Sequence, residues 1–313
     1  MTPPTTEPTT PAELPPLDVV IATHNRPELL RVALDAVLAQ TYAGQIRVTL
    51  VFDHTEIDHS LERDSGDRVV VAVNNTRSRG LAGARNTGIL EGDAPLVAFC
   101  DDDDEWMADK VALQVRALSG SAALTSVTGI IVSYADHHVV RIPRAEDMTL
   151  EQLVRDRVMA AHPSTVMVRR DALLGPIGLV DEEIPGSYGE DFDWIIRAAR
   201  AGDFAVVEDA LVTVLWGQSL FSQRWQTIID AIDYLVAKHP EFRADPGAMG
   251  RLGGRRSFAL AALGRRREAL GQAATALRSN PKERRAYLAA AVALHLVSAE
   301  RLMSIAHSRG HGI

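Results

Sequence analysis

VAFCDDDDEW, residues 97–106, is the stretch that decides the fold. The apolar run 96–100 is too short for a helix and too apolar for an exposed loop, so it predicts a buried strand. Five acidic residues, 101–105, follow at once. Ligands of open α/β sheets bind at the carboxyl ends of the strands, where carboxylates suit a divalent cation that shares phosphate oxygens with a substrate. The stretch therefore predicts a metal–phosphate site, with a solvated acidic loop as the alternative.

Composition and charge narrow the class of protein. The 313 residues suffice for one large domain and a smaller one, and 46% hydrophobic with 24% charged residues is typical of a globular protein. A net charge of −8 argues against binding of nucleic acid through bulk charge, so we expect no nucleic-acid partner. The single cysteine, Cys100, excludes an intrachain disulfide, and this predicts a cytoplasmic protein.

Neither end of the chain has a membrane signature. Residues 1–16 are rich in proline and threonine and lack the basic and apolar regions of a signal peptide, which predicts a disordered tail. The longest apolar candidate, residues 286–299, is too short to span a bilayer and contains His295. A packed helix is the better interpretation.

The first hundred residues alternate between strands and helices. Apolar runs at 17–23, 46–52 and 68–73 predict strands, and Pro27 opens an amphipathic helix that reaches about residue 40. This β-α-β order predicts a mostly parallel α/β sheet.

The last ninety residues read as wholly helical. We expect helices at 225–238, 257–263, 266–278 and 283–297, with a Gly- and Arg-rich break at 240–254. Part of this region is similar to one tetratricopeptide-type helix pair, although one unit does not make an array. The predicted organisation is a tail at 1–16, an α/β domain at 17–224 and a helical domain at 225–313.

Five motifs in a fixed order carry a family resemblance. They are DVVIATHNRPELLRVALDAVLAQTY, LVFD, GLAGARNTGI, VAFCDDDDEW and GLVDEEIPGSYGEDFDWIIRAARAG, and they span about 190 residues. Together they resemble the family 2 glycosyltransferases, inverting enzymes of the GT-A fold. The resemblance implies a Rossmann-like, mostly parallel sheet flanked by helices, here with an all-helical C-terminal extension. The order of the motifs is more specific than any one of them.

The resemblance also implies a role for each matching position. The loop 22–26 matches the segment that holds the nucleotide, and Asp191 matches the catalytic base. The implied nucleotide-binding residues are Thr23, Asn25, Arg26, Asp53 (the base), Arg85, Asn86 and Asp101 (the ribose). Asp103, with Asp101, matches the metal-binding acids of the D-x-D motif, and Asp104 matches a third acid of that motif.

The chemistry agrees with these roles. A Mn²⁺ or Mg²⁺ ion would stabilise the charge of a departing nucleotide diphosphate, and a UDP-sugar is the expected donor. A carboxylate can accept the proton of the attacking hydroxyl, and single displacement inverts the anomeric centre. Only one carboxylate base is needed, unlike the two of the glycosidases.

Two places depart from the family pattern. Asp53 is followed by His54-Thr55 rather than by a second acid and Gly-Ser, which weakens any inference about the base of the nucleotide. The late histidine of the family is missing from 215–219, and Ser219, Ser222 and Arg224 are the candidates to replace it. His162 lies where the family builds its acceptor side, and a plain turn into a strand is an equal alternative.

Other functions stay open at this stage. A sugar nucleotidyltransferase would carry a Gly-rich loop with Arg and Lys after the first strand, and His24-Asn25-Arg26-Pro27 stands there instead. A non-catalytic nucleotide-sugar-binding scaffold is the second alternative, disfavoured by Asp191. The acceptor can be a saccharide, a lipid-linked sugar or a small molecule.

The helical region raises two further hypotheses. It can mediate a homo-oligomer, and its arginines can make peripheral contact with a membrane or bind an anionic acceptor. These arginines are Arg251, Arg255, Arg256, Arg265, Arg266 and Arg267.

Overall fold

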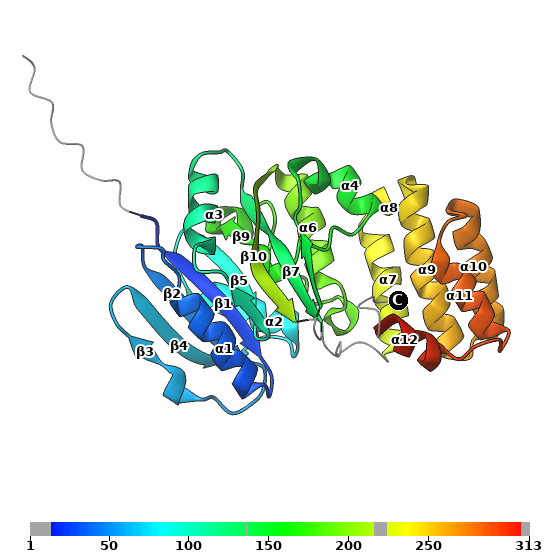
Figure 1. Cartoon of the computed structure of the whole chain (residues 1–313), viewed down its shortest axis with the longest axis horizontal. Coiled ribbons are helices and arrows are strands. Elements are labelled where there is room, and N and C mark those ends of the chain that lie inside the picture. The colour runs from blue at the N-terminus through cyan, green and yellow to red at the C-terminus, as the bar shows by residue number, and fades with distance from the viewer. Residues whose placement is uncertain (1–13, 135–136, 216–223, 308–313) are drawn as a thin grey trace, which may run out of the picture.

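The structure is a computed structural model that describes residues 14–134, 137–215 and 224–307. A ten-stranded sheet forms one part of it, and a group of helices packs beside the sheet (Figure 1). Most of the predicted tail 1–16, together with Ser219 and Ser222, lies outside the described residues. None of the described helices is long and apolar enough to cross a bilayer.

The sheet is mixed and mostly parallel through its first half. Its strand order is β3-β4-β2-β1-β5-β9-β7-β10-β6, and β8 pairs with β7. β1 runs parallel to both β2 and β5, and β2 runs parallel to β4, whereas β9 runs antiparallel to β5 and β7. The strands are β1 (Leu17–Thr23), β2 (Ile46–Phe52), β3 (Arg63–Asp64), β4 (Arg68–Asn74), β5 (Leu96–Asp101), β6 (Asp104–Trp106), β7 (Thr125–Tyr134), β8 (His137–Arg141), β9 (Met167–Arg169) and β10 (Phe204–Leu215).

The two faces of the sheet bury separate apolar clusters. Val19 and Ile21 of β1 point into the cluster under α1 and α3, and Val20 points into the cluster under α2, α5 and α6. This alternation is the period of two that a strand imposes. The α/β helices are α1 (Pro27–Leu38), α2 (Leu81–Glu91), α3 (Lys110–Ser119), α4 (Leu150–Arg155), α5 (Arg170–Leu174) and α6 (Glu190–Ala201), with short 3₁₀ turns η1 (His59–Leu61), η2 (Ala145–Met148), η3 (Pro163–Thr165) and η4 (Pro185–Ser187).

The C-terminal helices pack on the outer side of α6. Phe192 and Ile196 of α6 share one apolar cluster with Ile228, Ile232 and the helices beyond them, so the helical region continues the core of the α/β part (Figure 1). Its helices are α7 (Trp225–Lys238), α8 (Glu241–Ala244), α9 (Pro246–Ala262), α10 (Arg266–Ser279), α11 (Arg284–Ala293) and α12 (Ala299–His307).

The predicted fold class is confirmed, and one element is wrong. Strands 17–23 and 46–52 and helix 225–238 have the predicted bounds. The break at 240–254 is instead the short helix α8 and the first half of α9, which Asp245 caps by accepting the backbone N–H of Ala248 at 2.8 Å. The domain limits at 224 and 225 and the tetratricopeptide-like pair stay predictions.

Glycines of α9 explain that error. A Cβ on Gly250 would lie 2.4 Å from Cβ of Asn280, and one on Gly254 would lie 2.4 Å from Cγ of Glu283. The missing side chains let α9 approach the segment between α10 and α11 closely. Packing therefore outweighs the poor helix propensity of glycine.

Candidate active site

The acidic run leaves the sheet at the carboxyl end of β5. Thr23 and Asp53 follow the neighbouring strands β1 and β2, and the parallel register brings all three strand ends to one edge. Asp102 is buried, accepts the Thr23 hydroxyl proton at 2.8 Å and pairs with Arg26 at 3.1 Å. Asp103 pairs with the same Arg26 at 2.8 Å. Arg26 is therefore the cation that two of the four aspartates share.

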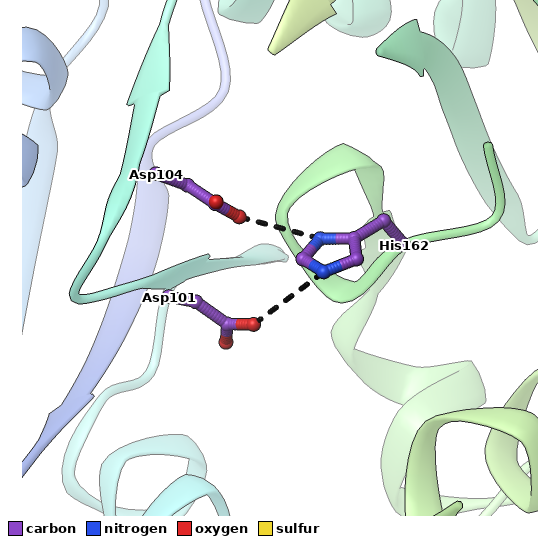
Figure 2. Close-up of side chains that lie close together, drawn as sticks. All are labelled: Asp101, Asp104 and His162. Carbon is purple, nitrogen blue, oxygen red and sulfur yellow. Dashed lines mark ion pairs between the residues drawn. The ribbon is translucent and has the colours of Figure 1, made fainter. Parts of the chain in front are cut away.

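The other two aspartates meet at His162. Figure 2 shows the imidazole between them, with Nε2 3.8 Å from Asp101 and Nδ1 3.3 Å from Asp104. Ser164 donates to Asp104 at 2.5 Å and accepts the backbone N–H of Asp101 at 2.9 Å. One ligand atom from each of Asp101, Asp104 and His162 lies within 4.8 Å of the others. This group fits a divalent cation in both spacing and donor type.

Electrostatics of the group favour a cation. Burial raises the pKa of Asp104 well above its ordinary value, and the negative charge of Asp101 raises it further. Burial also lowers the pKa of His162, which keeps the imidazole neutral and able to act as a ligand. The pKa of Asp103 is raised for the same reasons as that of Asp104. Carboxylates that resist ionisation in this way gain most from an added positive charge.

Asp53 occupies the other end of this edge. Its carboxylate accepts the Asn75 side-chain amide at 2.7 Å and the backbone N–H of Gly80 at 3.0 Å. His24 Nδ1 lies 2.9 Å from the backbone carbonyl of Asp53, while Asn25 stays exposed in a left-handed conformation with φ 56°. The loop after β1 and the end of β2 are thus fixed to each other, as the sequence prediction requires.

Arg85 and Asn86 have different surroundings, although they are adjacent on α2. Arg85 is buried and donates to Asp101 and to Glu190, at 2.6 Å each, and these carboxylates raise its pKa although burial opposes the charge. Asn86 exchanges two hydrogen bonds with the backbone of Val180, at 2.8 and 2.9 Å. Asn86 therefore fixes the segment that precedes α6.

The predicted base, Asp191, lies in the first turn of α6. Gly189 precedes this helix in a left-handed conformation with φ 82°, a conformation that glycine adopts readily. Asp191 forms an ion pair with Arg157, an interaction that sequence reasoning missed. Burial alone would raise the pKa of Asp191, but Arg157 and His162 outweigh it and hold the pKa below its ordinary value. Asp191 is therefore ionised at neutral pH.

Glu190 behaves in the opposite way. It is 4% exposed, and burial together with the charge of Asp191 raises its pKa to about 7 in spite of Arg85. Glu190, Asp191 and Arg85 line a small hollow whose remaining wall is apolar, with Trp194 and Phe99 packed edge to face at 6.2 Å. A single guanidinium, that of Arg85, thus joins Asp101 to Glu190, the residue next to the predicted base.

The predicted residues assemble at two neighbouring places. Thr23, Arg26, Asp53, Asp101 and Asp103 surround the strand ends, and Asp191 lies across the hollow. Arg157 and Glu190 were missed because their roles come from contacts 34 and 105 residues away in sequence. His162 carried a weak signal only, since its neighbours Pro163 and Ser164 are equally typical of a turn.

Known proteins resemble the chain in both sequence and fold. The family model "Glycosyl transferase family 2" matches residues 18–174, half of the chain. The UDP-Glc:alpha-D-GlcNAc-diphosphoundecaprenol beta-1,3-glucosyltransferase WfgD of Escherichia coli is 26% identical over 33% of this chain and 40% of its own length. The amylovoran biosynthesis glycosyltransferase AmsB of Erwinia amylovora is 35% identical over 30% of this chain and 32% of its own length. The matches thus span less than half of these relatives.

Solved structures match over most of the chain. Residues 1–349 of S. aureus TarS in complex with UDP-GlcNAc superpose with a TM-score of 0.60 and 14% identity, covering 94% of this chain and 92% of that one. The mannosyltransferase PcManGT from Pyrobaculum calidifontis, in complex with GDP-Man and Mn²⁺, gives a TM-score of 0.54 and 19% identity over 96% and 86%. At these identities the likeness shows the fold alone. With the family model on half of the chain, this chain belongs to the family 2 glycosyltransferases.

Proposed function

We propose that this chain transfers a sugar from a UDP-linked donor to a hydroxyl of a lipid-linked diphosphosaccharide, with inversion at the anomeric carbon. We call the four consecutive aspartates at the end of β5, Asp101–104, the strand-end group. One arrangement carries the proposal: Arg85 bridges Asp101 of this group and Glu190, at 2.6 Å on each side, and Glu190 is next to Asp191. A carboxylate suited to be a base therefore lies beside the strand ends, where α/β sheets bind their ligands.

Each site residue has a role in the proposed reaction. Asp191 accepts the proton of the acceptor hydroxyl while its oxygen bonds to the anomeric carbon. The bond from that carbon to the diphosphate breaks on the opposite face, and its electron pair leaves with UDP. Asp53, Thr23, Asn25, Arg26, Arg85 and Asn86 are the proposed nucleotide-side residues, with Asp101 toward the ribose.

A divalent cation belongs to this proposal. Asp101, Asp104 and His162 would hold it, and Asp103 stays the ligand that the D-x-D resemblance implies. When bound, Mn²⁺ or Mg²⁺ supplies Lewis-acid stabilisation of the diphosphate charge. Asp103 is paired with Arg26 at 2.8 Å through one carboxylate oxygen, and its other oxygen is the one that would join the cation.

Names of relatives support the choice of substrates. The two E. coli relatives and one from Campylobacter jejuni are named for transfer to diphosphoundecaprenol or diphospho-undecaprenol-linked sugars, and the first two for UDP-Glc. These names make a UDP-sugar the donor and a lipid-linked sugar the acceptor in our proposal. Peripheral contact with a bilayer and a homo-oligomer through the helical region remain predictions.

Asp191→Asn tests the proposed base. We expect transfer to fall about 10²- to 10⁴-fold, because the acceptor hydroxyl loses its proton acceptor, while titration of UDP with Mn²⁺ gives an unchanged affinity. The matched control is Asp171→Asn, which changes an exposed carboxylate on α5. Normal turnover by Asp191→Asn would refute the assignment. Binding of UDP-sugar by the unaltered chain, without transfer or hydrolysis, would support the scaffold hypothesis instead.

A further inference from the structure

Four arginines gather around the N-terminal turn of α6. Arg157 follows α4, Arg251 and Arg255 lie on α9, and Arg285 lies on α11. Figure 1 shows how α7 and α9 bring the helical region alongside α6. We call these four residues the arginine cluster.

Each arginine contacts a known part of the candidate site or lies beside one that does. Arg157 pairs with Asp191, the proposed base. The guanidinium of Arg251 lies over the ring of Phe192 at 5.3 Å, and that of Arg255 over the ring of Tyr188 at 5.5 Å. Tyr188 and Phe192 flank Asp191 in sequence. The cluster therefore lies beside Asp191, at the N-terminal turn of α6.

Positive charge in the cluster is poorly compensated. Among the described residues, Arg255 forms no ion pair, and Arg251 donates only to backbone carbonyls, at 3.1 Å to Val154 and 3.3 Å to Arg155. Arg285 reaches Glu283 at 3.4 Å with one nitrogen, and its buried Nε has no partner in the described part of the chain.

The pKa values of Arg251 and Arg255 indicate the same excess of positive charge. Burial lowers the pKa of Arg251 to about 10; Asp156 opposes this shift, and repulsion from Arg157, Arg255 and Arg285 adds to it. The pKa of Arg255 is lowered by burial and by Arg285 and Arg157, although Asp191 opposes the shift. Four arginines brought this close together, with only two of them paired with carboxylates, are suited to an anion.

Other arginines of the helical region differ. Arg256, the next residue along α9, is paired with Asp233 at 2.8 and 3.0 Å. Arg265 is paired with Glu268 at 2.8 and 2.5 Å. The basic set seen in the sequence thus includes Arg256 and Arg265, which carboxylates neutralise, and Arg251 and Arg255, which have no carboxylate partner among the described residues.

We propose that the arginine cluster binds the phosphate groups of the acceptor and thereby places the acceptor hydroxyl at Asp191. Guanidinium groups form paired hydrogen bonds with phosphate oxygens, and several of them match a diphosphate. A phosphate that draws Arg157 away would also leave the Asp191 carboxylate free to accept a proton. The inference rests on the proposed function, because it assumes that Asp191 is the base.

Pyrophosphate is the probe for this site. In metal-free buffer, we expect pyrophosphate to bind the full chain, and Arg255→Gln and Arg285→Gln each to weaken this binding about tenfold, as loss of a charge-assisted hydrogen bond predicts. Arg255→Lys retains the charge without the paired geometry and should fall between. Arg256→Gln, on the same helix, is the matched control and should bind like the unaltered chain.

Parallel measurements separate the explanations. All variants should bind UDP with Mn²⁺ with the same affinity, which would show that they fold. If the unaltered chain does not bind UDP with Mn²⁺, that result counts against the proposed function and not against the arginine cluster. Failure of pyrophosphate to bind, or equal binding by Arg255→Gln, overturns the inference. If Arg255→Gln reduces sedimentation with phosphatidylglycerol vesicles but spares pyrophosphate binding, the cluster contacts a lipid surface and the inference is likewise overturned.

Discussion

The strand-end group and the arginine cluster are opposite in charge and in origin. Four aspartates, Asp101–104, leave one strand consecutively, whereas the four arginines come from three separate elements. The first group has four carboxylates against Arg26 and Arg85, and the second has four arginines against Asp191 and Glu283. In our proposal, a divalent cation would add positive charge to the first group, and an acceptor phosphate would add negative charge to the second. The difference teaches that the two groups suit ligands of opposite charge.

The largest expected effect concerns the contact that joins α6 to the helical region, on which the arginine cluster depends. Asp193 is fully buried and accepts from Arg197 at 2.9 Å, Lys238 at 2.7 Å and His239 at 2.8 Å, which joins α6 to the end of α7. Asp193→Ala leaves these donors without their carboxylate and should lower the free energy of unfolding by about 3–5 kcal/mol.

Urea unfolding measures this loss. Asp233→Ala, which removes the exposed partner of Arg256, is the control and should cost no more than about 1 kcal/mol. If both variants unfold at the same urea concentration, the helical region does not depend on Asp193, and the comparison loses its connecting element.

A second prediction locates the metal ligands within the strand-end group. His162→Ala removes one of the three clustered ligands and should weaken binding of Mn²⁺ about 10- to 100-fold. His138→Ala, which removes an exposed histidine of β8, is the control and should bind Mn²⁺ like the unaltered chain. Titration with Mn²⁺ in the presence of UDP provides the measurement. Asp103→Asn decides between the sequence motif and the spatial cluster: a larger loss than for His162→Ala would favour the motif.

The smallest expected effect concerns Lys110, which packs against Trp106 just after the strand-end group. Lys110 is fully buried, lies over the Trp106 ring at 3.7 Å and donates to Gln114 at 2.7 Å, and burial lowers its pKa to about 7 from 10.5. Between these values the unfolded chain binds more protons than the folded one, so stability rises with pH across the window from about 7 to 10.5.

Lys110→Met should remove this rise of the free energy of unfolding with pH, which amounts to about 1 kcal/mol per pH unit. Urea unfolding of both chains at pH 7.5, 8.5 and 9.5 gives the difference directly. Parallel stability curves would contradict a neutral buried amine beneath the acids.

The sequence predicts the strand-end group well for a physical reason. Apolar runs such as 96–100 end abruptly at polar residues, and parallel strands bring such ends to one edge, so Asp53 and Asp101 can be placed without long-range information. The pairing of Asp103 with Arg26, and the contact of Asp104 with His162, depend on side-chain directions that a motif does not encode.

The arginine cluster could not be predicted in the same way. Arg157, Arg255 and Arg285 are far apart in sequence and come together only because α9 packs against α7 and α4, and α11 packs against α9. The first half of α9 was not predicted either, because Gly250 and Gly254 lower the local helix propensity. Glycine is favoured at these two positions because Asn280 and Glu283 approach the helix closely. Where tertiary packing decides, a local pattern misleads.

Arg85 has a thermodynamic consequence, because one guanidinium serves two carboxylates. Any ligand that withdraws Asp101 from Arg85 leaves the cation to Glu190 alone, and any change of charge at Glu190 is felt at Asp101. Coupling of this kind is reciprocal. A ligand bound at the strand ends changes the free energy of protonating Glu190, and protonation of Glu190 changes the free energy of binding that ligand by the same amount. Occupancy of the strand ends and protonation of Glu190 are therefore linked through a shared ion pair.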